Sequence, residues 1–206
     1  IKQDYADARE VAEFIESVQR DIVAHIHDLI DREESGEPGA AQSDYLPLLR
    51  RYRVNALVDH SHTTGAPVVY EDNPTFANLL GRIEHRAEWG AMTTDFNLIK
   101  PGALHRANGG FLLLDATQLL AQPYAWDGLK RVLKSGQLRI ESLERQGVSP
   151  MSLEPEPVNL DVKVALLGDR QTYYMLSEAD LDFDKLFKVA ADFAEYAPRT
   201  ADNEMR

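Results

Sequence analysis

The spacing of apolar residues predicts a long helix at the beginning of the chain. Between Asp4 and Arg32 the apolar side chains recur mostly at helical intervals, at Val11, Phe14, Ile15, Val18, Ile22, Ile26, Leu29 and Ile30. This stripe is close to a heptad, so the helix could pair with a second one, but burial in an ordinary core is the role we expect. Residues 33–43 are rich in glycine, proline and serine, which predicts a linker and a domain boundary.

After residue 44 the pattern changes to shorter elements that alternate between strand and helix. Apolar runs predict strands at 54–61, 68–70, 111–114 and 162–169, and helical spacing predicts helices at 74–86 and 126–135. Between the last helix and the last of these strands we expect two extended arms around a turn at Gln146 and Gly147. The expected fold class is therefore α/β, a parallel sheet with helices on both faces, preceded by the long helical segment.

The residues from Phe111 to Asp115 carry the strongest candidate chemistry. The unbroken apolar run from Phe111 to Leu114 indicates a buried parallel strand, because a run this short needs cover on both faces of a sheet. An aspartate at the carboxyl end of such a strand lies where open α/β sheets place their ligands. The alternative is that Asp115 only caps the helix that follows.

Two other groups of polar residues resemble metal sites. His60 and His62 would lie on one face of a strand, but no third histidine or cysteine is near them in the sequence. Asp180, Asp182 and Asp184 have the spacing of a calcium loop, but lysine stands at the sixth position, where that loop requires glycine. We therefore predict polar loop residues at the first group and solvated charges at the second.

Composition narrows the classes of protein further. The 206-residue chain carries a formal net charge of −12, which argues against general nucleic-acid binding. It contains no cysteine, which excludes thiolate chemistry and fits a cytoplasmic location. No apolar run approaches the ~20 residues needed to span a bilayer, so we expect no membrane association. The first residue is Ile1 at the edge of a helical pattern, which suggests a fragment of a longer protein.

A family resemblance is carried by the residues from Asn73 to Ala116, which read NPTFANLLGRIEHRAEWGAMTTDFNLIKPGALHRANGGFLLLDA. They closely resemble the AAA+ module of Lon-related proteases, in which an ATPase module precedes a serine protease domain. The resemblance continues upstream through RYRVNALVDHSHTTGAPVVYEDNP and downstream through AWDGLKRVLKSGQLRIE. It implies that residues 1–43 are a helical inserted segment with its linker. Residues 44–206 are then a partial AAA+ core that ends with a strand at 186–193.

The resemblance also implies a nucleotide site. Asp115 corresponds to the Walker B aspartate, which holds Mg²⁺ at the bound ATP, usually through water. Active relatives follow it with a glutamate that polarises the attacking water, whereas Ala116 stands here and a methyl group cannot act as a base. Asp127 and Glu141 are possible substitutes. Asp169 occupies the sensor 1 position, where an added carboxylate would repel a triphosphate unless Mg²⁺ intervenes, so the site is expected to be altered.

The loop from Trp89 to Asp95 is the expected substrate contact. In AAA+ relatives with an insertion at this position, the loop projects into the central pore of a ring and grips extended polypeptide. Met92 is the residue we assign to that grip, with Trp89 behind it, because a flexible thioether can contact many different side chains. The alternative is that Trp89 and Met92 are buried anchors of an ordinary loop.

Several expected parts of an ATP-dependent protease are missing from the sequence. It has no G-x-x-x-x-G-K-[ST] loop, and no serine has the context of a protease nucleophile. We therefore assign no catalytic residue in this chain, and peptide cleavage and normal ATP turnover are not expected of it alone. An arginine finger is not assigned either, since Lys185, Lys188 and Arg199 are the cations near the expected position.

The resemblance implies a function for the parent protein. The parent is expected to be an ATP-dependent serine endopeptidase with ATP and Mg²⁺ as cofactors. Its AAA+ portion would form a ring, expected to be a hexamer, and move unfolded or damaged polypeptide to the protease domain. The main alternative is a degenerate, non-hydrolysing scaffold that gates an ATP-independent protease. A third reading, an AAA+ transcriptional activator, would need a basic DNA-binding domain and the catalytic glutamate.

Overall fold

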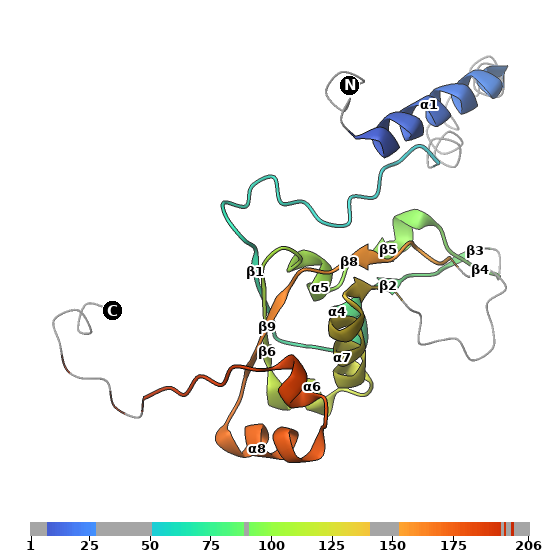
Figure 1. Cartoon of the computed structure of the whole chain (residues 1–206). Coiled ribbons are helices and arrows are strands. Elements are labelled where there is room, and N and C mark those ends of the chain that lie inside the picture. Colours follow the sequence, from blue (N-terminus) through green and yellow to red (C-terminus); the bar gives the residue numbers. More distant parts are fainter. Residues whose placement is uncertain are drawn as a thin grey trace. The chain divides into compact units, whose positions relative to one another are not determined.

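The computed structural model describes residues 8–27, 51–88, 91–140 and 153–194, with residues 196 and 199. The chain divides into two compact units, residues 1–55 and 56–206, which are considered separately (Figure 1). The boundary predicted after residue 43 lies outside the described residues and stays a prediction. In the described part of the chain, no helix is both long and apolar enough to cross a bilayer.

The first unit contains helix α1, Arg9–Ala24, which confirms the middle of the helix predicted over 4–32. None of its residues is buried, so the expectation that its apolar stripe packs in a core is wrong for α1. Polar bonds connect α1 to the end of the unit: the Asp21 carboxylate accepts hydrogen bonds from Tyr52 at 2.7 Å and Arg51 at 3.0 Å. These bonds lower the pKa of Asp21, with the Tyr52 hydroxyl the largest cause.

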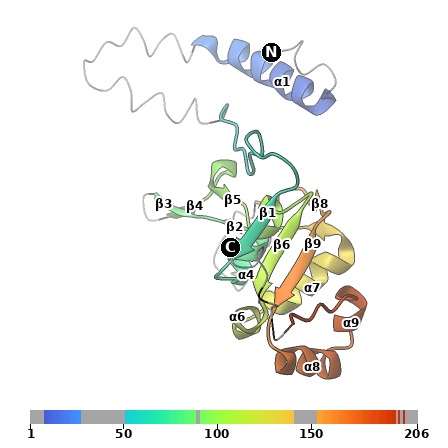
Figure 2. The same cartoon turned by 90° about the vertical axis from the view of Figure 1, so that its left-hand side faces the viewer.

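The second unit is built on a three-stranded parallel sheet of order β1-β6-β9 (Figure 2). Its strands are β1 (Val68–Glu71), β6 (Phe111–Asp115) and β9 (Lys163–Leu167), which confirms three of the predicted strands. The strand predicted at 54–61 is not formed. Its end turns instead, with the Asp59 carboxylate accepting the Ser61 N–H at 2.9 Å.

One face of this sheet is buried by helices. Leu112 and Leu114 of β6 are fully buried in a core that also contains residues of four helices. These are α4 (Phe76–Leu80), α5 (Ala103–Arg106), α6 (Ala116–Ala121) and α7 (Ala125–Ser135). In Figure 2, α4 and α7 lie behind the strands on this face.

The opposite face of the sheet is exposed in the described part of the chain. It presents large apolar side chains from all three strands: Val68, Tyr70, Phe111 and Leu167. The predicted cover by helices is thus found on one face. The unbroken apolar run in β6 predicts cover on both faces of the sheet, because successive residues of a strand point to opposite faces.

Glycines have two roles in α4 and α7. One allows the two helices to approach each other, and two others end the helices. A Cβ atom at Gly128 of α7 would lie 2.8 Å from Cε2 of Phe76, so a larger residue here would have to displace the Phe76 ring. The predicted helix at 126–135 is confirmed as α7, which ends at Gly136 with φ 65°. The helix predicted over 74–86 is shorter, since α4 ends at Gly81, whose φ of 91° favours glycine.

The chain after α7 forms the base of a hairpin and then two further helices. Strand β7 (Gln137–Leu138) pairs antiparallel with β8 (Val158–Asn159), as the two extended arms predicted; the tip lies outside the described residues. Helices α8 (Arg170–Ala179) and α9 (Phe183–Leu186) follow β9. The core strand expected at 186–193 is not formed: Leu186 is the last residue of α9, and residues 187–194 pair with no strand of the sheet.

The one-sided core predicts unequal effects of two leucine substitutions in neighbouring strands. Leu112→Ala removes a side chain with no exposed surface and should lower the free energy of unfolding by about 2–5 kcal/mol. Leu167→Ala removes a side chain that is 40% exposed on the open face and should cost less than about 1 kcal/mol. Urea denaturation of both variants measures the difference, and equal losses would contradict the one-sided core.

Candidate functional site

The two aspartates predicted to bind the cofactor lie at the same edge of the sheet. Asp115 is the last residue of β6, and its register partner in β9 is Leu167. Asp169 comes two residues after Leu167, directly before α8. Because β6 and β9 are parallel neighbours, the structure brings both residues to their common carboxyl edge, the usual ligand edge of open α/β sheets.

Both aspartates also cap helices. Oδ1 of Asp115 accepts the N–H of Gln118 at 2.8 Å at the start of α6, so Asp115 does cap this helix, while its role at a nucleotide stays a prediction. Oδ1 of Asp169 accepts the N–H of Thr172 at 2.7 Å at the start of α8. The backbone N–H and the hydroxyl of Thr172 lower the pKa of Asp169, so this carboxylate is charged at neutral pH.

The position after Asp115 is closed and apolar. Ala116 is buried, and its Cβ lies 3.2 Å from where a Cβ on Gly168 would stand. The ends of β6 and β9 therefore lie close together, and Ala116 places a methyl group there, at the position where the family resemblance predicted a glutamate in active relatives. Of the possible substitutes, Asp127 is paired with Lys130 at 3.2 Å on α7, and Glu141 lies outside the described residues.

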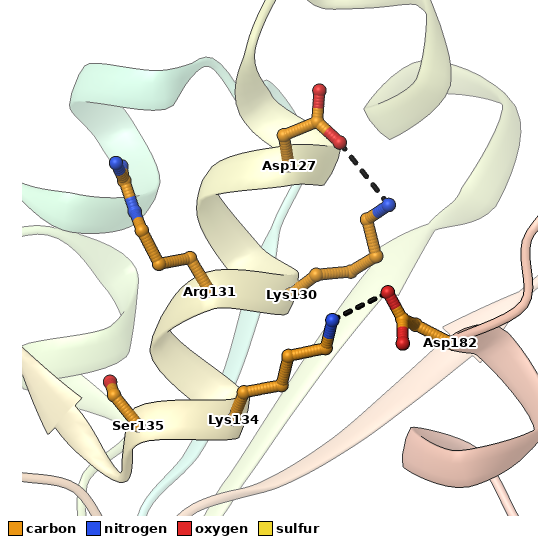
Figure 3. Close-up of a pocket in the computed structure, with 6 residues that line it drawn as sticks. All are labelled: Asp127, Lys130, Arg131, Lys134, Ser135 and Asp182. Atoms are coloured by element: carbon orange, nitrogen blue, oxygen red, sulfur yellow. Dashed lines mark hydrogen bonds and ion pairs between the residues drawn. The ribbon is translucent and has the colours of Figure 1, made fainter.

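An open pocket of about 530 Å³ is lined by residues of α7 and by Asp182 from the turn before α9 (Figure 3). Lys130 and Lys134 of this pocket, with Asp180 and Asp182, form a polar clamp between α7 and that turn. Nζ of Lys130 lies 2.7 Å from Oδ2 of Asp180, and Nζ of Lys134 lies 2.5 Å from Oδ2 of Asp182. Trp126 also donates its indole N–H to Asp180 at 2.8 Å. The prediction that Asp180 and Asp182 are only solvated charges is wrong, because the lysines sit one helical turn apart on α7 and meet both carboxylates.

An aromatic stack supports this clamp. The rings of Trp126 and Phe187 are stacked with centroids 5.9 Å apart, and Phe183 lies against both. The hydrogen bond from Lys130 lowers the pKa of Asp180 to about 2. Since the clamp's lysines already face carboxylates, its evident role is to fasten α9 to α7.

The clamp predicts a stability difference between two aspartates that contact the same lysine. Asp180→Asn weakens charge-assisted hydrogen bonds and should lower the free energy of unfolding by about 1–3 kcal/mol. Asp127→Asn is the matched control; its side chain is 79% exposed, so its loss should stay below about 0.5 kcal/mol. Thermal or urea unfolding checks both, and a loss at Asp127 as large as at Asp180 would contradict the clamp.

The predicted substrate loop is part of a two-stranded arm, residues 82–100 (Figure 1). Near the core, β2 (Arg82–Ile83) pairs with β5 (Ile99–Lys100), and farther out β3 (Arg86–Glu88) pairs with β4 (Ala91–Thr93). Between the two pairs, the Thr94 hydroxyl donates to the carbonyl of Glu84 at 2.8 Å. The arm is therefore hydrogen-bonded along its length.

Met92 lies near the outer end of this arm. It pairs across the hairpin with Ala87, and its side chain is 55% exposed. The alternative that Met92 is a buried anchor is therefore wrong. Trp89 lies outside the described residues, so both interpretations of Trp89 stay open.

Sequence reasoning missed the residues at the root of the arm. A Cβ on Gly102 would lie 2.2 Å from the carbonyl oxygen of Leu79 and 2.4 Å from the nitrogen of Gly81. The N–H of Gly102 donates to Nδ1 of His105 at 3.2 Å, inside the protein. The sequence signal for this root is the pair Gly81 and Gly102, one on each side of the arm. Glycines at such positions are also typical of ordinary turns.

The buried imidazole at the root predicts a pH dependence of stability. His105 is 5% exposed, and burial lowers its pKa from 6.5 to about 4. The neutral ring thus contributes stability that is complete above the unfolded pKa of 6.5 and is lost as the pH falls towards 4. We expect a loss of about 3 kcal/mol across this window. His105→Gln keeps an acceptor but does not titrate, so the loss should be smaller; equal pH profiles of unfolding would contradict this assignment.

Comparison with known proteins places these features in a family. A family model described as "LonB-like, AAA domain" matches residues 64–194, which include the sheet, the arm and both aspartates. Two curated proteins, each named "Putative Lon protease homolog", are similar to parts of the chain. The protein from Escherichia coli (strain K12) is 34% identical over 74 residues, and that from Haemophilus influenzae (strain ATCC 51907 / DSM 11121 / KW20 / Rd) is 35% identical over 101 residues.

These matches cover small parts of long relatives. The first spans 36% of this chain and 12% of the relative, and the second spans 49% and 16%. A crystal structure of NtrX from Brucella abortus matches 89% of this chain and 42% of its own, with 19% identity and a TM-score of 0.39. Because the family model matches more than half of the 206 residues, the chain belongs to the LonB-like AAA domain family, as its resemblance to the Lon-related AAA+ module implied.

Proposed function

We propose that this chain is the part of a Lon-related ATP-dependent protease that recognises unfolded polypeptide and moves it towards a serine protease domain. The observation that supports this most directly is the arm at 82–100, which extends from the core of a LonB-like AAA domain and carries an exposed methionine. An exposed, unbranched thioether can pack against many different side chains, as a contact for unfolded substrates requires. Trp89, at the same end of the arm in sequence, would add a second apolar contact.

The proposed nucleotide site is the carboxyl edge of β6 and β9. Asp115 and Asp169 supply carboxylate oxygens, which are the ligands that Mg²⁺ prefers, so the residues fit a magnesium ion brought by ATP. Asp115 would hold the ion through water, and Asp169 would be tolerated beside a triphosphate only with the ion present. The phosphate-binding loop is not among the 206 residues, so another part of the parent protein would supply it.

The exposed sheet face also supports a role inside a larger assembly. Val68, Tyr70 and Phe111 form an apolar surface of a kind that open parallel sheets normally cover. We propose that the remaining AAA+ core of the parent packs on this face, and that copies of the completed module form a ring, expected to be a hexamer. The parent would be a cytoplasmic serine endopeptidase, with no membrane or general nucleic-acid partner.

A second candidate function is supported by Ala116. If the buried methyl group means that no base activates water, the module would be a scaffold that gates an ATP-independent protease. The arm would then recognise substrates without force from ATP hydrolysis. Asp115, still at the carboxyl edge of its strand, favours the first candidate.

Assays of the full-length parent separate the two candidates. ATP binding, ATP hydrolysis and degradation of an unfolded protein are measured with ATP, with a non-hydrolysable analogue and without nucleotide. Degradation that needs ATP turnover supports the motor and requires another acid to replace the missing glutamate. Degradation that proceeds unchanged without nucleotide supports the gating scaffold, and failure to degrade unfolded protein under any of these conditions contradicts both.

The arm contact predicts an effect of Met92 on substrate capture. Met92→Ser removes the apolar grip and should weaken crosslinking of an unfolded polypeptide to the parent by about tenfold, whereas Met92→Leu should retain most of it. Met175→Ser is the matched control, because Met175 is also about half exposed but lies on α8. An equal loss at Met92 and Met175, or no loss at Met92, would argue against the arm as the contact.

A further inference from the structure

The arm is joined to the core through α5. The backbones of Gly81 and Gly102 touch at the point where the arm's two strands leave α4 and α5, so neither position can accept a Cβ without a shift of backbone. A Cβ on Gly81 would lie 2.7 Å from the carbonyl oxygen of Lys100, the last residue of β5. Since backbone atoms rather than flexible side chains make these contacts, the root of the arm and the start of α5 move together.

Two successive residues of α5 bind opposite partners. His105 accepts the N–H of Gly102 and so holds the root of the arm. Arg106 places Nη2 2.8 Å from Oε2 of Glu71, the last residue of β1. Glu71 is 8% exposed and pairs in register with Leu114, directly before Asp115. The short helix therefore connects the arm to the same sheet edge that carries the candidate nucleotide site.

The contacts of α5 differ in how well they can fix the orientation of the helix. Ala103 and Leu104 are fully buried in the core, but apolar packing is not directional. The Arg106–Glu71 contact is a charge-assisted hydrogen bond, which constrains distance and angle. A single helical turn is too short to resist rotation through its own hydrogen bonds, so an external directional contact is needed to set its orientation.

We propose that Arg106 is a positioning residue that sets the direction of the arm relative to the nucleotide edge of the sheet, through its ion pair with Glu71. The geometric part of this inference, that Arg106 fixes the direction of the arm, concerns this chain alone. Its consequence is that a displacement at the sheet edge moves the whole arm and with it the polypeptide contact, and only this consequence rests on the proposed function. Arg106 acts through Glu71 and α5, not as a ligand of nucleotide or polypeptide.

Distance measurements between spin labels test the geometric part. The chain contains no cysteine, so Met92→Cys on the arm and Thr117→Cys on α6 give two unique labelling positions. With Arg106 present, one narrow distance distribution is expected. Arg106→Gln should replace it with a broad distribution, and Arg106→Lys, which keeps a cation for Glu71, should restore much of the narrow one. A broad distance distribution in the labelled chain that retains Arg106, or a narrow one in the Arg106→Gln variant, overturns the proposal.

Two further variants separate positioning from general damage. Arg82→Gln is the matched control, because it removes an exposed ion pair with Glu84 inside the arm and should leave the distribution narrow. Glu71→Gln removes the charge of the same pair from the other side without leaving an unpaired buried carboxylate, so it should also broaden the distribution. Hydrogen exchange of the Leu112 amide confirms that the sheet is still folded. If Arg106→Gln unfolds the chain, the distance distribution of the Glu71→Gln variant tests the proposal instead, and a narrow distribution there overturns it.

Crosslinking in the full-length parent tests the consequence. An unfolded polypeptide is crosslinked from a photoreactive group at position 92, with and without ATP. The unmodified parent should show nucleotide-dependent crosslinking, and Arg106→Gln should lose the dependence while its ATP binding stays the same. Absence of crosslinking in the unmodified parent would contradict the proposed function and leave the spin-label result to decide on Arg106. Dependence retained in Arg106→Gln would overturn the consequence of this inference.

Discussion

The structure of the second unit depends on burying one face of a three-stranded parallel sheet. Leu112 and Leu114 project from β6 into a core formed with α4, α5, α6 and α7, and both are completely removed from solvent. At roughly 25 cal/mol per Å² of apolar surface, this burial is the main favourable term available to so small a sheet. The position of each neighbouring element follows from it. The helix crossing at Gly128, the short α5 and the root of the arm all lie on the covered face.

This one-sided arrangement separates the two parts of the candidate site. The residues proposed to bind nucleotide, Asp115 and Asp169, lie at the carboxyl edge of the strands, where they begin helices. The proposed polypeptide contact lies on an arm whose strands are bonded to each other rather than to the sheet. A conformational signal between the two proposed sites would have to cross the covered face. The contacts of α5 provide such a crossing, with backbone contact at one end and an ion pair at the other.

Several residues have a structural role and a proposed functional role at once. Asp115 caps α6 with one carboxylate oxygen, which fixes the side chain at the sheet edge and so positions it as a metal ligand would need. Ala116 is equally informative: a buried methyl group packed close to Gly168 keeps the strand ends together. A methyl group cannot activate water, so the two proposed functions differ in whether another acid of the parent protein takes that role.

The sequence by itself determined the elements with strong local signals. The apolar runs gave the three strands, helical spacing and Gly136 gave α7, and the family motif gave the Lon-related AAA module. Local signals did not show that one sheet face is open in the described residues, since the unbroken apolar run in β6 predicted cover on both faces. Contacts between distant residues were decided only by tertiary structure. These include Asp180 and Asp182 on the α7 lysines, Arg106 on Glu71, and Gly102 against Gly81. No periodicity records such pairs, because they form only after the chain has packed and brought together side chains that lie far apart in sequence.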